Sequence, residues 1–374
     1  MSNKFFLLSF IVIPLFAGAG YTVVKNFSSL PVTPRQIPTD STRWIHFPRE
    51  IHLQNTRQLT FGAENAEAYW SFDGEKLTFQ RTDNQQFHCD QIFWGTVPPD
   101  TLSSFQYTLE STGKGRTTCS FFLPGDSLIL YASTHATQDT CPPVPDQVKI
   151  GKYVWPVYNS YEIYVSDLKG NIKRQLTKNK FYDAEGTVSP KGDKIIFTSD
   201  RNGDLDLYEM NPDGSNVMRI TNKPGYDGGG CFSPDGSKIV WRASRPKNFE
   251  EKWEYRELLK QGMVAPTQMQ VYVANADGSD VHQVTHLPGA NWAPCFTPDG
   301  KKILFASNYE YPHGFPFSLY LINLDGTGLE KVTYSGRFDA FPMFSPDGKR
   351  LVWCSMRNGR SPHEINIFVA DWIP

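Results

Sequence analysis

The sequence has almost no net charge and no basic excess. Among its 374 residues, 37 are lysine or arginine and 39 are aspartate or glutamate, which gives a formal net charge of −2. Proteins that bind nucleic acid use a basic surface to contact phosphates, so no nucleic-acid partner is expected. Beyond the N-terminus, the sequence also lacks any apolar run long enough to span a membrane.

The N-terminus carries the single long apolar run. Lys4 precedes twelve apolar residues, 5–16, and the small residues Ala17-Gly18-Ala19 follow. This order is typical of a signal peptide that is cleaved after Ala19, which predicts export to the periplasm or the extracellular space. The alternative is an uncleaved anchor, because residues 5–24 contain no charge and are long enough to cross a bilayer. Contact with a membrane is expected only in that case.

In contrast to net charge, turn-forming and aromatic residues are abundant in the sequence. The chain has 29 glycines, 27 prolines and 14 % aromatic residues, a composition typical of all-β proteins with short strands. A turn of the Ser-Pro-Asp-Gly type between two apolar runs occurs six times, with copies of varying fidelity. Its copies begin at residues 71, 123, 189, 233, 297 and 345.

A second hairpin lies between successive copies of this turn. Four clear examples, each a strand, an Asp-Gly-type turn and a strand, are residues 164–177, 208–221, 272–285 and 320–333. In all four, 12 positions separate the final threonine from the first residue of the next turn. Each repeat therefore contains four strands, here called A to D. Four-stranded repeats of more than forty residues are typical of propeller blades.

The two ends of the repeat region complete each other. Residues 51–60 resemble a D strand without a C strand before it, and residues 365–371 resemble a C strand without a D strand after it. The sequence thus predicts an all-β fold, a six-bladed β-propeller of four-stranded blades in which the N-terminal strand completes the last blade. The predicted organisation is a signal peptide at 1–19, a linker at 20–50 and the propeller at 51–374.

The repeat resembles the TolB-like family of bacterial propellers. The resemblance rests on the Phe-Ser-Pro-Asp-Gly turn and the Lys-Ile-Val-Trp strand after it, as in residues 232–241, and it extends over residues 51–374. It implies a six-bladed propeller outside the cytoplasm that acts as a binding platform, without naming the ligand. TolB itself has a separate N-terminal domain. This chain has only about 30 residues at that place, so the envelope role of TolB is not carried over.

Long loops predict which face of the propeller is functional. The A–B and C–D turns are mostly tight and lie on one face, whereas the B–C loops lie on the other face together with the links between blades. Two B–C loops are long, residues 133–160 and 245–268, and the second contains a predicted helix at 249–262. Binding residues concentrate on variable loops held by a rigid scaffold, so this face is the candidate site.

Polar residues recur where strand A begins, at the same face. The residues six positions before each turn are Asn65, Thr117, Asp183, Asp227, Asn291 and Asp339, and Glu67 and Glu185 follow two positions later. Because strand A is innermost, these side chains are expected to surround the channel mouth. Carboxylates so close repel one another, which calls for protonation, for Arg116 or Arg242, or for a cationic ligand. We therefore predict ligand binding there, with a divalent cation possible. The alternative is that these residues cap the backbone.

The cysteines predict one disulfide. Export makes oxidation available, and Cys89, Cys119 and Cys141 are all placed near the loop-rich face by the topology. The expected pair is Cys119–Cys141, which would restrain the long loop of the second blade. The other three cysteines, Cys231, Cys295 and Cys354, are expected to be buried thiols.

Two functions follow from these patterns. The first is an exported, monomeric binding platform that recognises a protein or cell-envelope partner through the loop-rich face, without a cofactor. The second is a metal-dependent propeller enzyme that acts on a carbohydrate or peptide. Histidines in the predicted loops raise this alternative: His88, His135, His313 and His363, with His286 in a link. The sequence nevertheless has no H-x-x-H or HExxH spacing and no G-x-S-x-G motif.

Overall fold

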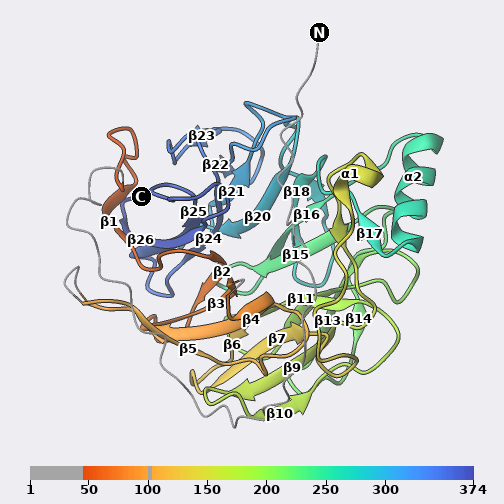
Figure 1. Ribbon diagram of the computed structural model, residues 1–374. Helices are drawn as coiled ribbons and strands as arrows, with labels where there is room; N and C mark the ends of the chain where they lie inside the picture. The colour runs from red at the N-terminus through yellow and green to blue at the C-terminus, as the bar shows by residue number, and fades with distance from the viewer. Residues whose placement is uncertain (1–44, 84, 100–102) are drawn as a thin grey trace.

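The chain folds as a six-bladed β-propeller, as the repeats predict (Figure 1). The computed structural model describes residues 45–83, 85–99 and 103–374, so the predicted signal peptide lies outside the described residues. Within those ranges, neither helix has the length and hydropathy that crossing a bilayer requires.

Each blade is one antiparallel sheet of four strands. Blades 1 to 3 contain β2 (Glu64–Trp70), β3 (Lys76–Asp83), β4 (Phe87–Thr96) and β5 (Gln106–Leu109); β6 (Thr117–Phe122), β7 (Leu128–Ser133), β9 (Glu162–Asp167) and β10 (Ile172–Gln175); β11 (Asp183–Val188), β12 (Ile195–Ser199), β13 (Asp206–Met210) and β14 (Met218–Arg219). Blades 4 and 5 contain β15 (Asp227–Phe232), β16 (Lys238–Ala243), β18 (Gln270–Asn275) and β19 (His282–Gln283); β20 (Asn291–Phe296), β21 (Lys302–Ser307), β22 (Ser318–Asn323) and β23 (Glu330–Lys331). Blade 6 consists of β24 (Asp339–Phe344), β25 (Arg350–Ser355), β26 (Asn366–Trp372) and β1 (Leu53–Gln58).

The repeated turn is stabilised by the side chains that define its sequence. In blade 4, the Ser233 hydroxyl donates a hydrogen bond to Asp235 at 2.6 Å and accepts one from the backbone N–H of Lys238 at 2.9 Å. Gly236 follows with a φ of 74°, which favours glycine. The same hydroxyl-to-aspartate contact occurs at Thr297 and Ser345. The turn therefore recurs because each blade needs the same tight link between its two innermost strands.

The ring closes through the first and last strands. Strand β1 pairs antiparallel with β26, with Leu53 opposite Trp372 and Gln58 opposite Phe368, and the two strands lie side by side in Figure 1. The predicted closure is thus confirmed, and β26 is not left as an open edge.

Residues 45–50, which the sequence assigned to the linker, pack against the last blade. Glu50 is buried and accepts hydrogen bonds from both terminal nitrogens of Arg357, each at 2.9 Å. Arg357 also donates to the backbone oxygen of Ile45 and to Asp339. The three charged side chains are fully buried. The contact between the N-terminal segment and the ring therefore begins before β1.

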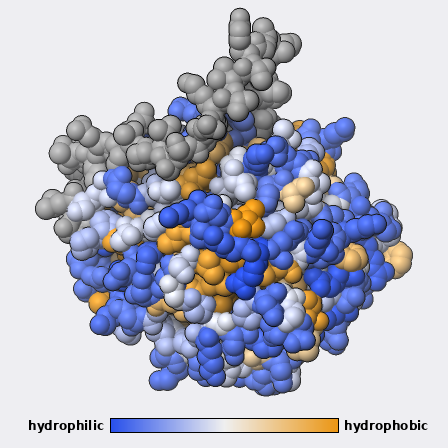
Figure 2. Space-filling model, turned by 90° about the horizontal axis from the view of Figure 1, so that it is seen from below, coloured by the Kyte–Doolittle hydropathy of each residue, from blue (hydrophilic) through white to orange (hydrophobic). Residues whose placement is uncertain are grey.

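Apolar side chains fill the spaces between blades. In one such cluster, Phe79 and Phe93 of blade 1 pack with Val352 and Val369 of blade 6. Figure 2 shows one face of the molecule, on which apolar surface appears near the middle and hydrophilic side chains surround it.

The two long B–C loops pair with each other. The loop of blade 2 contains α1 (Gln147–Ile150) and β8 (Trp155–Pro156), and the loop of blade 4 contains α2 (Phe249–Lys260) and β17 (Met263–Val264). Strands β8 and β17 form a separate two-stranded sheet. Figure 1 shows α1, β17 and α2 grouped on one side of the ring. The predicted helix at 249–262 is confirmed and ends two residues earlier than expected.

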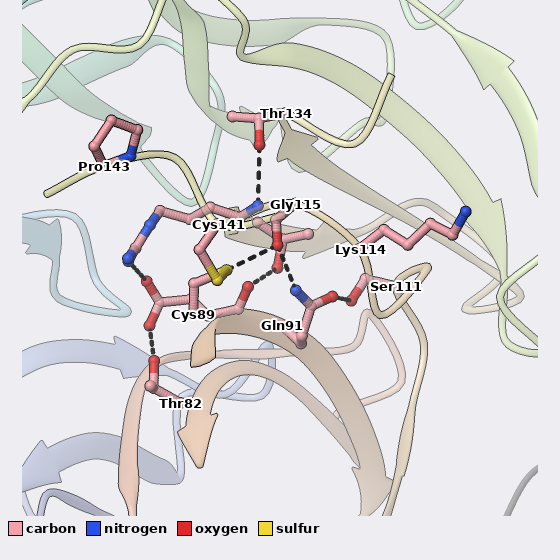
Figure 3. The surroundings of a disulfide bond; sticks show 12 residues. Thr82, Cys89, Gln91, Ser111, Lys114, Gly115, Thr134, Cys141 and Pro143 are labelled. Atoms are coloured by element: carbon pink, nitrogen blue, oxygen red, sulfur yellow. Dashed lines mark hydrogen bonds and ion pairs between the residues drawn. A yellow bond between two sulfur atoms is a disulfide. The ribbon is translucent and has the colours of Figure 1, made fainter. Parts of the chain in front are cut away.

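The disulfide joins Cys89 to Cys141, so the predicted partner Cys119 was wrong (Figure 3). Cys89 lies near the start of β4 in blade 1, where the long loop of blade 2 crosses it. Cys119 lies within β6 and its side chain lines the central cavity instead. The bond therefore ties the loop to the neighbouring blade, not to its own.

Reducing this disulfide is expected to lower the free energy of unfolding by roughly 2–4 kcal/mol, because the bond shortens the unfolded chain across 52 positions. Urea unfolding with and without reductant measures the change. The variant Cys141→Ser provides the control, since reductant should not affect it further. Equal unfolding curves for the oxidised and reduced wild-type protein would contradict this expectation.

Candidate functional site

Every A strand has a bulge at the same position of the repeat. The ladder between strands A and B shifts register in all six blades, and the second residue after the polar start of strand A has a positive φ of 45–62°. These six bulge residues are Glu67, Cys119, Glu185, Gly229, Ala293 and Phe341. A bulge redirects a side chain out of the regular alternation of a strand. All six bulge residues line one cavity.

This cavity lies at the centre of the ring and has a volume of about 300 Å³. The A strands form its wall, and the paired long loops contribute Trp155, Pro156 and Val264. Both long loops, which the sequence placed on one face, therefore reach the centre of the ring. Cavities of this size are at the lower end of those that hold small molecules.

Glu185 and Arg242 form the most complete polar contact in the cavity. The Arg242 guanidinium pairs with the Glu185 carboxylate, which also accepts hydrogen bonds from Thr198 and Tyr226, each at 2.6 Å, and from the N–H of Gly229 at 2.8 Å. Burial alone would raise the pKa of Glu185, but Arg242 and these donors lower it below its ordinary value. Glu185 is therefore a carboxylate whose charge is fully compensated.

Glu67, at the equivalent bulge in blade 1, is not compensated in this way. Burial raises its pKa to about 7, even though the Cys119 thiol contacts the carboxylate. One carboxylate oxygen, Oε2, is buried without a hydrogen-bond partner among the described residues. Burial and the nearby Asp90 also raise the pKa of Glu64 to about 7. The blade 1 side of the cavity therefore has two carboxyl groups that are easily protonated.

Arg116 lines the cavity but neutralises a residue that the sequence analysis did not consider. It forms an ion pair with Asp90 of β4, and its backbone N–H donates to Thr134 at 3.0 Å. Asp90 also accepts a hydrogen bond from Thr82. Arg116 is therefore engaged within blades 1 and 2 and does not pair with the bulge glutamates.

The other half of the cavity is apolar and aromatic. Blades 5 and 6 contribute Trp292, Ala293, Phe338 and Phe341 to the wall. Trp155 of the loop pair lies with its ring centroid 5.0 Å from that of Trp292. One half of the cavity therefore carries charged groups and the other half offers flat apolar surfaces.

The aspartates that begin the A strands lie elsewhere. Asp183, Asp227 and Asp339 are fully buried, do not line the cavity, and each pairs with an arginine of its own blade. The three arginines are Arg201, Arg245 and Arg357. Each arginine lies two residues after the strand B residue that pairs with the aspartate.

The neutral residues at the start of strand A also form hydrogen bonds within the fold. Asn65 and Asn291 donate to backbone oxygens, and Thr117 donates to the backbone oxygen of Asp90. None of the three lines the cavity. The structure thus brings together Glu67, Arg116, Glu185 and Arg242 from the predicted set. The other predicted site residues do not line the cavity: the three aspartates pair within their own blades, and Asn65, Thr117 and Asn291 each bond to the backbone of the preceding blade.

No metal centre is apparent in the described part of the chain, where no three histidine, cysteine, aspartate or glutamate side chains are arranged to hold an ion. The predicted divalent cation and the metal-dependent alternative remain predictions.

Glu64, Asp90 and the aromatic wall were not predicted from the sequence. A signal for the wall was available, because the residue two positions after the A-strand start is glutamate in the first and third repeats but small or apolar in the last three. No comparable signal exists for Trp155. Its position depends on the pairing of β8 with β17, and these strands belong to two loops that are far apart in the sequence.

Comparisons with known proteins agree with this architecture. The family described as the TolB beta propeller domain matches residues 154–257 and 263–369. Among solved structures, a putative TolB from Agrobacterium tumefaciens is 20 % identical with a TM-score of 0.52, covering 83 % of this chain and 91 % of that one.

Two further structures are similar in fold. TolB from Acinetobacter baumannii is 18 % identical with a TM-score of 0.50, and the match covers 83 % of this chain but only 64 % of that one. A gluconolactonase from Xanthomonas campestris is 14 % identical with a TM-score of 0.54, covering 92 % of this chain and 100 % of that one. At these identities the likeness concerns the fold alone, and the fold hosts both TolB proteins and an enzyme.

Proposed function

The chain belongs to the TolB beta propeller domain family, and from this we propose that it is an exported binding platform that recognises a protein or cell-envelope partner through its loop-rich face. The observation that supports the proposal is the central cavity, which two paired loops overhang and which is polar on one side and aromatic on the other. Export is proposed from the N-terminal sequence, which the structure does not describe.

The proposed ligand-binding residues are Glu67, Arg116, Glu185 and Arg242. They converge on one cavity from four different blades, so a ligand there contacts several elements of a rigid ring. A closed ring loses little conformational freedom on binding, which favours recognition by a preformed site. The buried aspartates Asp183, Asp227 and Asp339 are then expected to support the fold.

Site-specific photo-crosslinking tests this proposal. A benzoylphenylalanine is placed at Val144, which lines the cavity from the blade 2 loop, or at Lys301, which is exposed in a turn on the opposite face. In extract of the native cell envelope, the first position is expected to give one discrete adduct that saturates with protein concentration. The second position is the matched control and is expected to give none. Identical adducts from both positions, or none from Val144, would refute recognition through the loop-rich face.

A further inference from the structure

Among the residues that the structure describes, only one of the two bulge glutamates has a cationic partner. Glu185 of blade 3 pairs with Arg242, which the next blade supplies from the strand B position opposite Gly228. Glu67 belongs to blade 1, so the next blade is blade 2. The equivalent strand B position there is Ala132, which lies opposite Thr118. An alanine side chain carries no charge. The position that provides an arginine for Glu185 therefore provides no cation for Glu67.

The bulge residues next to the two glutamates also leave different amounts of space for a cation. In blade 4 the bulge residue is Gly229, and a Cβ there would collide with the Arg242 guanidinium, so glycine makes room for the arginine. In blade 2 the bulge residue is Cys119, whose thiol contacts Glu67. Glu67 lines the cavity, and its Oε2 is buried without a hydrogen-bond partner among the described residues.

The charges around the cavity do not balance. Its wall contains four carboxylates and two arginines, which are Glu64, Glu67, Asp90, Glu185, Arg116 and Arg242. Each arginine already pairs with one carboxylate, Arg116 with Asp90 and Arg242 with Glu185. The two remaining carboxyl groups, Glu64 and Glu67, are those whose pKa burial raises to about 7.

The cavity already accommodates one cation against aromatic rings. The guanidinium carbon of Arg242 lies 5.3 Å from the Trp155 ring centroid and 5.2 Å from that of Tyr226. Such cation–π contacts stabilise a positive charge that has left water. The aromatic wall of blades 5 and 6 continues this surface.

We propose that the cavity binds an ammonium group carried on an apolar body, with the ammonium at Glu67 and the body against the aromatic wall of blades 5 and 6. This deepens the proposed function, on which it rests, by naming the chemistry of the ligand. The ammonium donates a hydrogen bond to the Glu67 carboxylate and supplies the charge that Arg242 supplies to Glu185. It belongs to a free amine or to a lysine side chain of a partner protein.

Calorimetric titration of the intact protein tests the proposal. The probes are 4-phenylbutylamine, its uncharged counterpart 4-phenylbutanol, and Nα-acetyl-lysine methylamide. At pH 8 the amine is expected to bind at least tenfold more tightly than the alcohol. If the lysine derivative binds as well as the amine, the ammonium comes from a partner. If it does not bind, the ligand is a free amine. Equal affinity for amine and alcohol, or no binding of any amine, overturns the proposal.

The dependence on pH provides a second readout. The groups that face Glu67 from the neighbouring strands are Cys119, Glu185, Arg242, Asp90 and Tyr69. With a pKa of about 7, Glu67 is about one-tenth ionised at pH 6 and nine-tenths ionised at pH 8. The ammonium is charged at both values, so amine affinity is expected to rise about tenfold from pH 6 to pH 8. Affinity that is constant or falls over this range contradicts a role for Glu67.

Two variants separate the site from the fold. Glu67→Gln is expected to remove the preference for amine over alcohol, and at pH 8 its melting temperature should equal or exceed that of the wild type. Glu75→Gln, which changes an exposed glutamate on the turn face, is the matched control. Ala293→Phe fills the apolar half without touching Glu67 and should weaken the amine at least tenfold. An unchanged amine preference in Glu67→Gln overturns the inference, whereas crosslinking at Val144 reports separately on the proposed function.

Discussion

Replacing Arg357 with methionine is expected to lower the free energy of unfolding by roughly 3–5 kcal/mol. The substitution leaves Glu50 and Asp339 buried with their shared cation removed, and both side chains are fully inaccessible. The Arg357 guanidinium lies over the Trp353 ring, and methionine places an apolar group of similar length there, so the loss reports mainly on the charges. Urea unfolding at pH 7 measures the difference.

The double variant Arg357→Met with Glu50→Gln is the control for this interpretation, because it removes one of the stranded carboxylates. It is expected to recover part of the lost stability. If Arg357→Met costs less than about 1 kcal/mol, as an exposed ion pair would, the contact between the N-terminal segment and blade 6 does not stabilise the ring.

Deleting residues 51–60 is expected to have a still larger effect. The deletion removes β1, exposes the edge of β26 and takes away Leu53, which is fully buried in the largest apolar cluster. We expect a loss of about 5 kcal/mol or more, which is comparable with the whole stability of many domains. An open strand edge also promotes association between chains.

Deleting residues 25–43 provides the comparison, because it leaves β1 and Glu50 in place. Thermal unfolding and light scattering distinguish the two shortened chains. If both melt at the same temperature and both stay monomeric, closure of the ring by β1 is not what holds blade 6 together.

The fold was predictable because its information is local and repeated. A turn such as Ser233 to Gly236 is specified by four adjacent residues, and six copies at comparable spacing predict the number of blades. Closure by residues 51–60 followed from counting strands. The pairing of Cys89 was not predictable, because it depends on where the long loop of blade 2 crosses its neighbour.

The site was only partly predictable, for a reason that concerns the geometry of strand A. Position in the repeat predicted that Asp183, Asp227 and Asp339 would face the channel. The bulge rotates the strand, so the residue two positions later faces it instead. Glu67 and Glu185 were found because they occupy that later position. The arginines of the buried pairs, such as Arg201, could have been recognised, since arginine occupies that place only in blades that begin with aspartate.

A blocked cavity tests the central claim, that the chain binds its partner through the centre of the ring. Ala293→Phe places at the blade 5 bulge the residue that blade 6 has at Phe341, and the two positions share a positive φ, 45° and 55°. The larger side chain should therefore fit the backbone and fill the cavity. With benzoylphenylalanine at Val144, the account predicts that Ala293→Phe abolishes the adduct formed in envelope extract and leaves the melting temperature unchanged. The same adduct yield from a folded Ala293→Phe protein would contradict it.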